Sequence, residues 1–291
     1  MKKRKSKIVF WLFLFPGVFA FTNTILIPFA LGIVNSFTDW DGIALIGARF
    51  VGLENYREAF HDQGFRDAVL ITIRYTAAVV IIVNVVGFSL AYLVTREFRS
   101  SRILQTLFFM PNMMGGLVLG FVWKFIFTKI FVQTGALIGA ETIFYNWLNQ
   151  PGPAFWSIVI ASVWQMMGYV MLIYIAGLQS MPADVLEAAK IDGAGGFSYI
   201  GKILLPLVMP AISVCLFIVL NYSFKQFDVN LALTNGGPYG TTQMVALNIY
   251  NTAYKYSNFA FSLSKSIVMF VMVMVISLLQ TGFTKKREVE L

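Results

Sequence analysis

Six stretches of the chain are apolar over a length that suits a membrane-spanning helix, and polar segments separate them. Such a helix needs about 20 mostly apolar residues. The six stretches cover roughly 8–36, 68–94, 103–128, 155–178, 203–226 and 261–284. Because unpaired backbone polar groups are costly in lipid, each stretch is predicted to be helical. The pattern predicts an all-α, polytopic bundle of six transmembrane helices, in a single membrane domain over residues 1–291.

The composition supports a membrane protein. Of the 291 residues, 58% are hydrophobic and 12% are charged, whereas about a quarter of the residues in soluble domains are charged. The basic segment 1–7 precedes an apolar run that is too long for a secretory signal, so it is interpreted as the start of an uncleaved first span. Cys215 is the only cysteine, so the sequence allows no internal disulfide and no cysteine metal cluster, and His61, the only histidine, has no metal-ligating neighbours.

Basic residues predict the orientation of the spans, since cytoplasmic loops carry an excess of lysine and arginine. One side of the predicted bundle holds thirteen: Lys2, Lys3, Arg4, Lys5, Lys7, Arg96, Arg99, Arg102, Lys190, Lys202, Lys285, Lys286 and Arg287. The other side holds five: Arg49, Arg57, Arg66, Lys129 and Lys255. Both termini of this multi-pass membrane protein are therefore predicted to be cytoplasmic.

The predicted cytoplasmic segment 179–202 is not a simple loop. Pro182 suits the first turn of a helix, and Gly193 is a stop signal. A helix over about 183–192 is predicted at the membrane surface, and Ala188 and Ala189 would give it a small-residue face that another protein could approach closely. A lipid-anchoring helix would be basic with large apolar residues. This one carries Asp184 and Glu187, which favours a protein partner.

The same segment resembles the EAA motif of permease subunits of ABC importers. The matching residues are Glu187-Ala188-Ala189, Asp192-Gly193-Ala194, Ile203, Leu205-Pro206 and Pro210. The resemblance implies a type I ABC importer permease fold. It also implies that the EAA and Asp-Gly-Ala residues form a coupling helix that docks on a cytoplasmic ATPase. Ile200 departs from the motif, where these subunits usually carry phenylalanine.

Three further stretches resemble the first permease of maltose-type carbohydrate importers, and the similarity covers nearly the whole chain. They are Trp40-Asp41-Gly42, 50–56 and Leu233-Thr-Asn-Gly-Gly-Pro238. The resemblance implies a second, similar permease subunit, two ATPase subunits that bind ATP and magnesium, and an external sugar-binding protein. It implies no cofactor and no enzymatic activity in this chain. Residues 196–202 match the phosphate-loop pattern G-x-x-x-x-G-K. The pattern requires a serine or threonine next, to bind magnesium, and Ile203 has no hydroxyl, so a nucleotide site is rejected.

Polar residues inside the spans are expensive and tend to face a cavity or a partner. They are Arg74, Asn84, Lys124, Gln165, Asn221, Lys225, Gln226 and Lys265. Arg74 and Lys265 lie near predicted outer ends and are expected to snorkel towards the interface. For Lys124 the sequence allows two interpretations, snorkelling and contact with a partner. Asn84 is expected to hydrogen-bond between helices.

Two helical faces combine amide, hydroxyl and aromatic groups, which is the chemistry that binds sugars. Gln165 and Tyr169 are four residues apart on the fourth span, and Tyr222, Ser223 and Gln226 share a face of the fifth. The matching positions line the translocation cavity in maltose-type relatives, so the resemblance implies a substrate path here. The alternative is hydrogen bonding between helices.

The leading interpretation is half of the translocation pathway of a sugar importer, with an oligosaccharide as the expected substrate. A glycerol-phosphate-type permease is the alternative within the family, because Lys225 and Lys265 could favour an anion. A secondary transporter or channel would leave the acidic inner helix without a purpose. A membrane-embedded enzyme would need a catalytic cluster, which the sequence does not offer.

Overall fold

The computed structural model describes residues 2–43, 48–95, 101–191 and 196–286, and these are almost entirely helical. Within these ranges the only extended pairing is a single bridge between Thr38 and Phe50. The contacts divide the chain into two compact units. Unit 1 comprises Met1–Gln63 and Ile249–Phe270, and unit 2 comprises Gly64–Asn248 and Val271–Leu291. The single domain over 1–291 stays a prediction.

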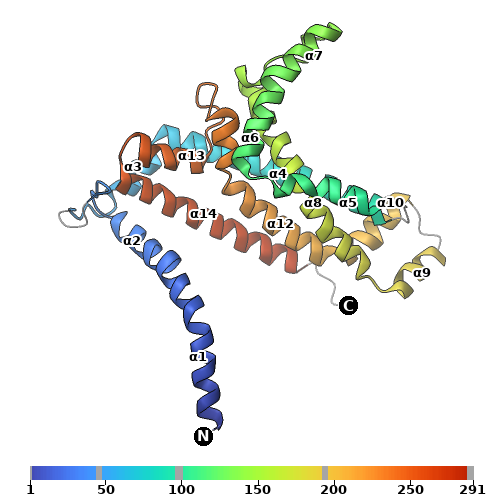
Figure 1. The fold of residues 1–291 in the computed structure, drawn as a ribbon, viewed down its shortest axis with the longest axis horizontal. Coiled ribbons are helices and arrows are strands. Elements are labelled where there is room, and N and C mark those ends of the chain that lie inside the picture. The colour runs from blue at the N-terminus through green and yellow to red at the C-terminus, as the bar shows by residue number, and fades with distance from the viewer. Residues whose placement is uncertain (1, 44–47, 96–100, 192–195, 287–291) are drawn as a thin grey trace. The chain divides into compact units, whose positions relative to one another are not determined.

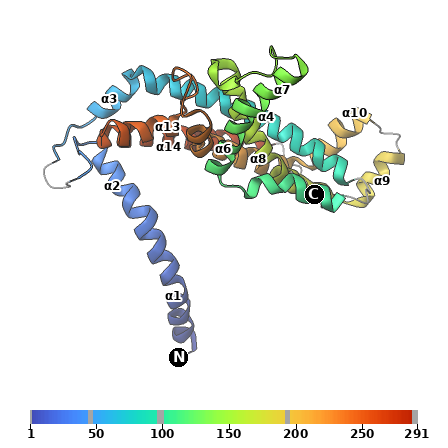
Figure 2. The same cartoon turned by 45° about the horizontal axis from the view of Figure 1, so that its top comes forward.

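Unit 1 begins with a long apolar rod. Helix α1 (Lys2–Phe21), a π-helical turn (Thr22–Leu26) and α2 (Ile27–Asn35) follow one another without a break (Figure 2). Large apolar side chains such as Phe13 and Leu12 are exposed along this rod. Exposure on this scale is unfavourable in water, so the rod is suited to lipid or to another chain.

The rest of unit 1 contains a buried ion pair. It comprises α3 (Glu54–His61), the end of α13 (Val245–Tyr250), a π-helical turn (Asn251–Lys255) and the first part of α14 (Phe259–Lys285). Lys265 is 2% exposed. Its ammonium lies 2.7 Å from a carboxylate oxygen of Asp62, 3.0 Å from Thr252 Oγ1 and 4.3 Å from the centre of the Phe261 ring.

The expectation that Lys265 snorkels is therefore wrong. The ammonium stays buried because Asp62, which follows α3 in the sequence, supplies a counter-charge. Arg74, by contrast, is exposed on α4. His61 is exposed, with Nδ1 2.7 Å from the Arg57 carbonyl oxygen, and no group of metal-ligating side chains occurs in the described part of the chain.

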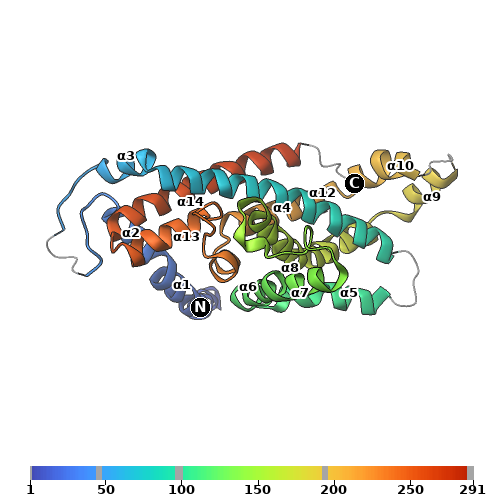
Figure 3. The same cartoon turned by 90° about the horizontal axis from the view of Figure 1, so that it is seen from above.

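In unit 2, the long helix α8 (Pro151–Gln179) contacts α5, α6 and α12, and Figure 3 shows it among them. Helix α4 (Gln63–Thr95) also contributes buried side chains to the core, including Tyr75 and Val79. Tyr174 on α8 donates a 2.7 Å hydrogen bond to Asn84 Oδ1 on α4. The expected role of Asn84 as a link between helices is confirmed.

The third predicted span, 103–128, is broken in the structure. Helix α5 (Ser101–Phe109) and a 3-10 turn (Met110–Met113) lead to two extended residues, Met114 and Gly115. Then α6 (Gly116–Phe125), a π-helical turn (Ile126–Ile130) and α7 (Phe131–Ile138) follow, drawn in green in Figure 1. Pro111 explains the break in part, since proline lacks the N–H that would continue the helix. The helix that suits a membrane is 116–138 rather than 103–128.

The fifth predicted span, 203–226, is bent. A short α10 (Gly196–Tyr199), a π-helical turn (Ile200–Leu204) and α11 (Leu205–Leu207) precede α12 (Met209–Phe224). The helical segments Ile200–Leu207 and Met209–Phe224 meet at an angle of 70°. Within the described residues, five helices are long and apolar enough to cross a membrane, or six if this bent pair is counted as one span. Upstream, α9 (Ala183–Ile191) confirms the helix predicted over about 183–192, whereas its position at the membrane surface stays a prediction.

Candidate functional site: a polar pocket at the end of α12

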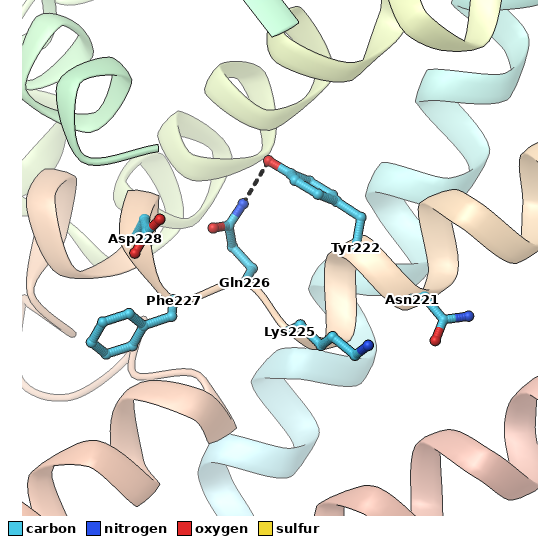
Figure 4. A pocket seen from close by; sticks show the side chains of 6 residues that line it. All are labelled: Asn221, Tyr222, Lys225, Gln226, Phe227 and Asp228. Carbon is cyan, nitrogen blue, oxygen red and sulfur yellow. Dashed lines mark hydrogen bonds between the residues drawn. The ribbon is translucent and has the colours of Figure 1, made fainter. Parts of the chain in front are cut away.

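A cavity of about 390 Å³ lies where α12 ends and the chain becomes irregular. Its lining comes from one short segment, Asn221, Tyr222, Lys225, Gln226, Phe227 and Asp228 (Figure 4). The walls combine two aromatic rings, two amides and two charges of opposite sign. Lys225 and Asp228 are exposed, whereas Gln226 is 5% exposed. Amides and rings suit an uncharged polar ligand, and the opposite charges leave the lining without a net charge.

Helix α6 holds this segment through two glycines four residues apart. A Cβ on Gly116 would lie 2.6 Å from Asp228 Cβ, and one on Gly120 would lie 2.6 Å from Ala232 Cβ. Ala232 belongs to the π-helical turn Asn230–Thr234, which contacts α6. Small residues at this spacing allow close packing of helices in membranes. The position of the pocket segment therefore depends on α6.

A chain of hydrogen bonds leads from the pocket into the bundle. Gln226 Nε2 donates to the Tyr222 hydroxyl at 2.8 Å, as drawn in Figure 4. That hydroxyl donates to Gln165 Oε1 on α8 at 2.6 Å. Gln165 Nε2 then donates to the Met114 carbonyl oxygen at 3.0 Å, which is the point where the third apolar segment breaks. Three predicted site residues are thus directly connected.

Further contacts hold both atoms of the Gln226 amide. Its Nε2 lies 3.4 Å from both Tyr75 Oη and Ser162 Oγ, and Tyr75 donates to Ser162 at 2.7 Å. The backbone N–H of Val229 donates to Gln226 Oε1 at 3.4 Å. These contacts join α4, α8 and the residues after α12, so the pocket floor is tied to three elements.

Of the five residues predicted to form the substrate path, only Tyr222 and Gln226 line the pocket. Gln165 lies behind it and is 7% exposed. Tyr169 packs partly buried against the apolar core. Ser223 is fully buried, and its hydroxyl has no hydrogen-bond partner among the described residues.

Sequence reasoning missed other members of the site. Asn221 stood out as a polar residue within a span but received no role, and Lys225 was considered only as a charge that could favour an anion. Asp228 lies beyond the predicted end of the fifth span, although the charge itself was a usable signal. Nothing in the sequence pointed to Tyr75 and Ser162, because a tyrosine and a serine within an apolar helix are common packing residues.

The second candidate surface is the exposed face of α9. Asp184, Glu187 and Ile191 are exposed and lie three and four residues apart, so they share one side of the helix. Ala189 is 7% exposed, and Leu186 packs on the core of unit 2. The expected small-residue face at Ala189 is thus turned inwards. Asp192, Gly193 and Ala194 lie outside the described residues, as does the side chain of Ala188.

Comparison with known families decides the kind of protein. Residues 83–289 match the binding-protein-dependent transport system inner membrane component. The chain belongs to this family. It is therefore a multi-pass membrane component of an ABC transport system, a permease subunit whose ATPase is a separate protein.

Two relatives cover most of the chain. The probable starch degradation products transport system permease protein AmyD of Thermoanaerobacterium thermosulfurigenes is 44% identical, over 99% of this chain and 97% of the relative. The sn-glycerol-3-phosphate transport system permease protein UgpA of Escherichia coli O157:H7 is 33% identical, over 82% of each chain.

Comparison with solved structures identifies the fold. A subunit of a bacterial ABC transporter involved in the import of the acidic polysaccharide alginate superposes with a TM-score of 0.84. The match covers 98% of both chains at 19% sequence identity. The fold is that of a type I ABC importer permease, as the EAA motif implied.

Proposed function

We propose that this permease forms half of the translocation pathway of a sugar importer, and that its substrate is a short oligosaccharide derived from starch. The 44% identity to a starch-product permease over nearly the full length is the observation that carries the proposal. The pocket chemistry agrees with it. Tyr222 and Phe227 offer ring faces, and Asn221 and Gln226 offer amides for hydroxyl groups.

The glycerol-phosphate alternative has support in the UgpA relative, but the charges weaken it. A phosphate site needs a net positive field. Lys225 is offset by Asp228 in the same lining. Lys265 is buried against Asp62 in unit 1 and has no free charge to offer an anion. An uncharged substrate fits the lining better.

Three kinds of protein partner follow from this function. The permease pairs with a second, similar permease, receives sugar from an external binding protein and docks on one of two cytoplasmic ATPase subunits. ATP and magnesium are bound by those ATPase subunits, and this chain holds no cofactor. The exposed acidic face of α9, with Asp184 and Glu187, is the surface that contacts the ATPase.

The orientation follows from the basic residues. Placing the third span at 116–138 moves Lys129 out of the outer loops, which increases the predicted bias towards the inside. With Cys215 replaced by alanine, single cysteines at Lys285 and Tyr239 should differ in labelling of intact cells. An impermeant maleimide is expected to label position 239 and not position 285. Labelling of position 285 in sealed cells would contradict cytoplasmic termini.

The function is tested by reconstituting the four-subunit complex in liposomes with its external binding protein. We expect ATP-dependent uptake of radiolabelled maltotetraose and no uptake of glycerol 3-phosphate. Omitting the binding protein should abolish uptake, which controls for leakage. Uptake of glycerol 3-phosphate without uptake of the oligosaccharide would replace the sugar assignment by the alternative.

A further inference from the structure

We propose that Gln165 is a positioning residue that connects the pocket at the end of α12 to the break in the third apolar segment. Its role would be to set the arrangement of α6 against α8 according to whether the pocket is occupied. The inference rests on the proposed function for the identity of the ligand. It assigns Gln165 a task different from direct contact with sugar.

The hydrogen bonds of Gln165 support this assignment. The side-chain oxygen accepts from Tyr222 at 2.6 Å, and the nitrogen donates to the Met114 carbonyl at 3.0 Å. Both ends of the amide are therefore occupied by protein groups, and the residue lies outside the pocket lining. A substrate hydroxyl meets Tyr222 and Gln226 first, and Gln165 can respond to it only through Tyr222.

The break explains why the second bond matters. Met114 (φ −79°, ψ 133°) and Gly115 (φ −62°, ψ 142°) are extended, so the Met114 carbonyl does not accept a helical hydrogen bond. A backbone carbonyl without a partner is costly inside a membrane. Gln165 supplies the donor from another helix. The break therefore depends on α8 as well as on Pro111 in its own segment.

The chain of bonds also has a direction. Gln226 donates to Tyr222, Tyr222 donates to Gln165, and Gln165 donates to Met114. Consecutive bonds of this kind strengthen one another, so a change at one end alters the next bond. A sugar hydroxyl that accepts from Tyr222 would take the place of Gln165 as the acceptor of that hydrogen bond. Gln165 would then lose the bond that orients its amide towards Met114.

A separate contact makes α6 responsive to this change. Gly116 packs on Asp228, a residue of the pocket lining, and Gly120 packs on Ala232 just beyond it. The pocket segment, 221–228, therefore packs on α6 as one unit. The Gln165–Met114 hydrogen bond links that unit to α8. Releasing the bond is a local step that would let the two separate.

A double-mutant cycle tests the proposal in the assembled transporter. The variants are Gln165→Leu, Tyr222→Phe and the combination, and the readout is the factor by which sugar-loaded binding protein stimulates ATP hydrolysis. Each single variant is expected to reduce stimulation about fivefold, which corresponds to one neutral hydrogen bond. The double variant should be no worse than the worse single one, because both interrupt the same chain of hydrogen bonds. Independent effects, which would multiply to about 25-fold, would overturn the proposal.

Asn84 and Tyr174 provide a matched control. They too form a buried amide–tyrosine bond of 2.7 Å between two helices, but neither lines the pocket. Asn84→Leu should lower the yield of assembled complex and leave stimulation per assembled complex unchanged. If Gln165→Leu behaves in the same way as Asn84→Leu, Gln165 is only structural and the proposal fails.

A second readout needs no substrate, so it separates this proposal from the sugar assignment. Met114 packs partly buried against the core, and Cys215, the native cysteine, is fully buried. In a Cys215→Ala background, the thiol of Met114→Cys should react with a maleimide several times faster when Gln165→Leu is added. Asn84→Leu should not change that rate. An unchanged rate with Gln165→Leu would refute the link even if maltotetraose proves to be the wrong substrate.

Discussion

Replacing Glu187 by lysine is expected to abolish sugar uptake while the subunit still inserts and pairs with the second permease. Glu187 is exposed on α9, on the same side as Asp184 and Ile191. Among the described residues, neither acidic side chain forms a hydrogen bond or an ion pair. An acidic surface is complementary to a basic groove, which the ATPase is expected to supply. Reversing one charge there places like charges together, which costs about 3 kcal/mol, or roughly a hundredfold in affinity.

The measurement is co-purification of the ATPase with tagged permease, together with uptake in cells. Glu141→Lys is the matched control, because it reverses the same charge on an exposed glutamate outside α9. It should leave both readouts unchanged. Glu187→Gln should give an intermediate loss, since it removes the charge without reversing it. Normal uptake by Glu187→Lys would mean that α9 does not dock through this face.

The surface helix illustrates what sequence alone could predict. Pro182 and the early acidic residues define a start, and α9 occurs at Ala183–Ile191 as expected. The long helices α4 and α8 also follow directly from their apolar runs. Which side of α9 is free did not follow, because Ala189 packs inwards while Ile191 is 85% exposed. Burial of a small side chain depends on the neighbouring helix, not on local spacing.

Breaks and bends were harder to predict than spans. An apolar run stays apolar across Met114 and Gly115, so hydropathy merged two segments into one span over 103–128. Pro111 was a usable warning, as Pro206 and Pro210 were for the bend between α11 and α12. The partner that makes the first break tolerable, Gln165, lies 51 residues away. Such a compensation can be found only once the fold is known.

Charged residues in spans show the same limit. Lys265 has the sequence context of a snorkelling lysine near a span end, yet it is buried against Asp62. Asp62 belongs to another segment, more than two hundred positions earlier in the chain. Position along a span predicts the cost of a charge, whereas the identity of its partner requires tertiary structure.

The packing of α5 on α8 gives the second large expected effect, which concerns assembly rather than coupling. A Cβ on Gly168 of α8 would collide with the carbonyl group of Phe108 on α5 and would lie 2.7 Å from the backbone nitrogen of Phe109. These are backbone atoms, so no side-chain rotation can relieve the contact. The two helices must move apart, and overpacking of this kind typically costs about 1–3 kcal/mol.

Gly168→Ala is therefore expected to lower the thermal stability of the assembled complex, and Gly168→Val to prevent its assembly. Alanine gains about 1 kcal/mol in helix propensity over glycine, which offsets part of the clash. Gly152 is the matched control, because it lies in the same helix and a Cβ there meets nothing within 4 Å. Gly152→Ala should retain or raise stability.

Thermal unfolding of the purified complex, followed by loss of the intact assembly, measures both substitutions. The effect should reach the substrate pathway as well, because Gly168 lies three residues from Gln165 on the same helix. Moving α5 away from α8 shifts the segment that carries Met114 and weakens its bond to Gln165. The surviving Gly168→Ala complexes should therefore also show faster maleimide labelling at Met114→Cys in the Cys215→Ala background. If Gly168→Ala is as stable as Gly152→Ala, the close approach of α5 and α8 does not hold in the membrane.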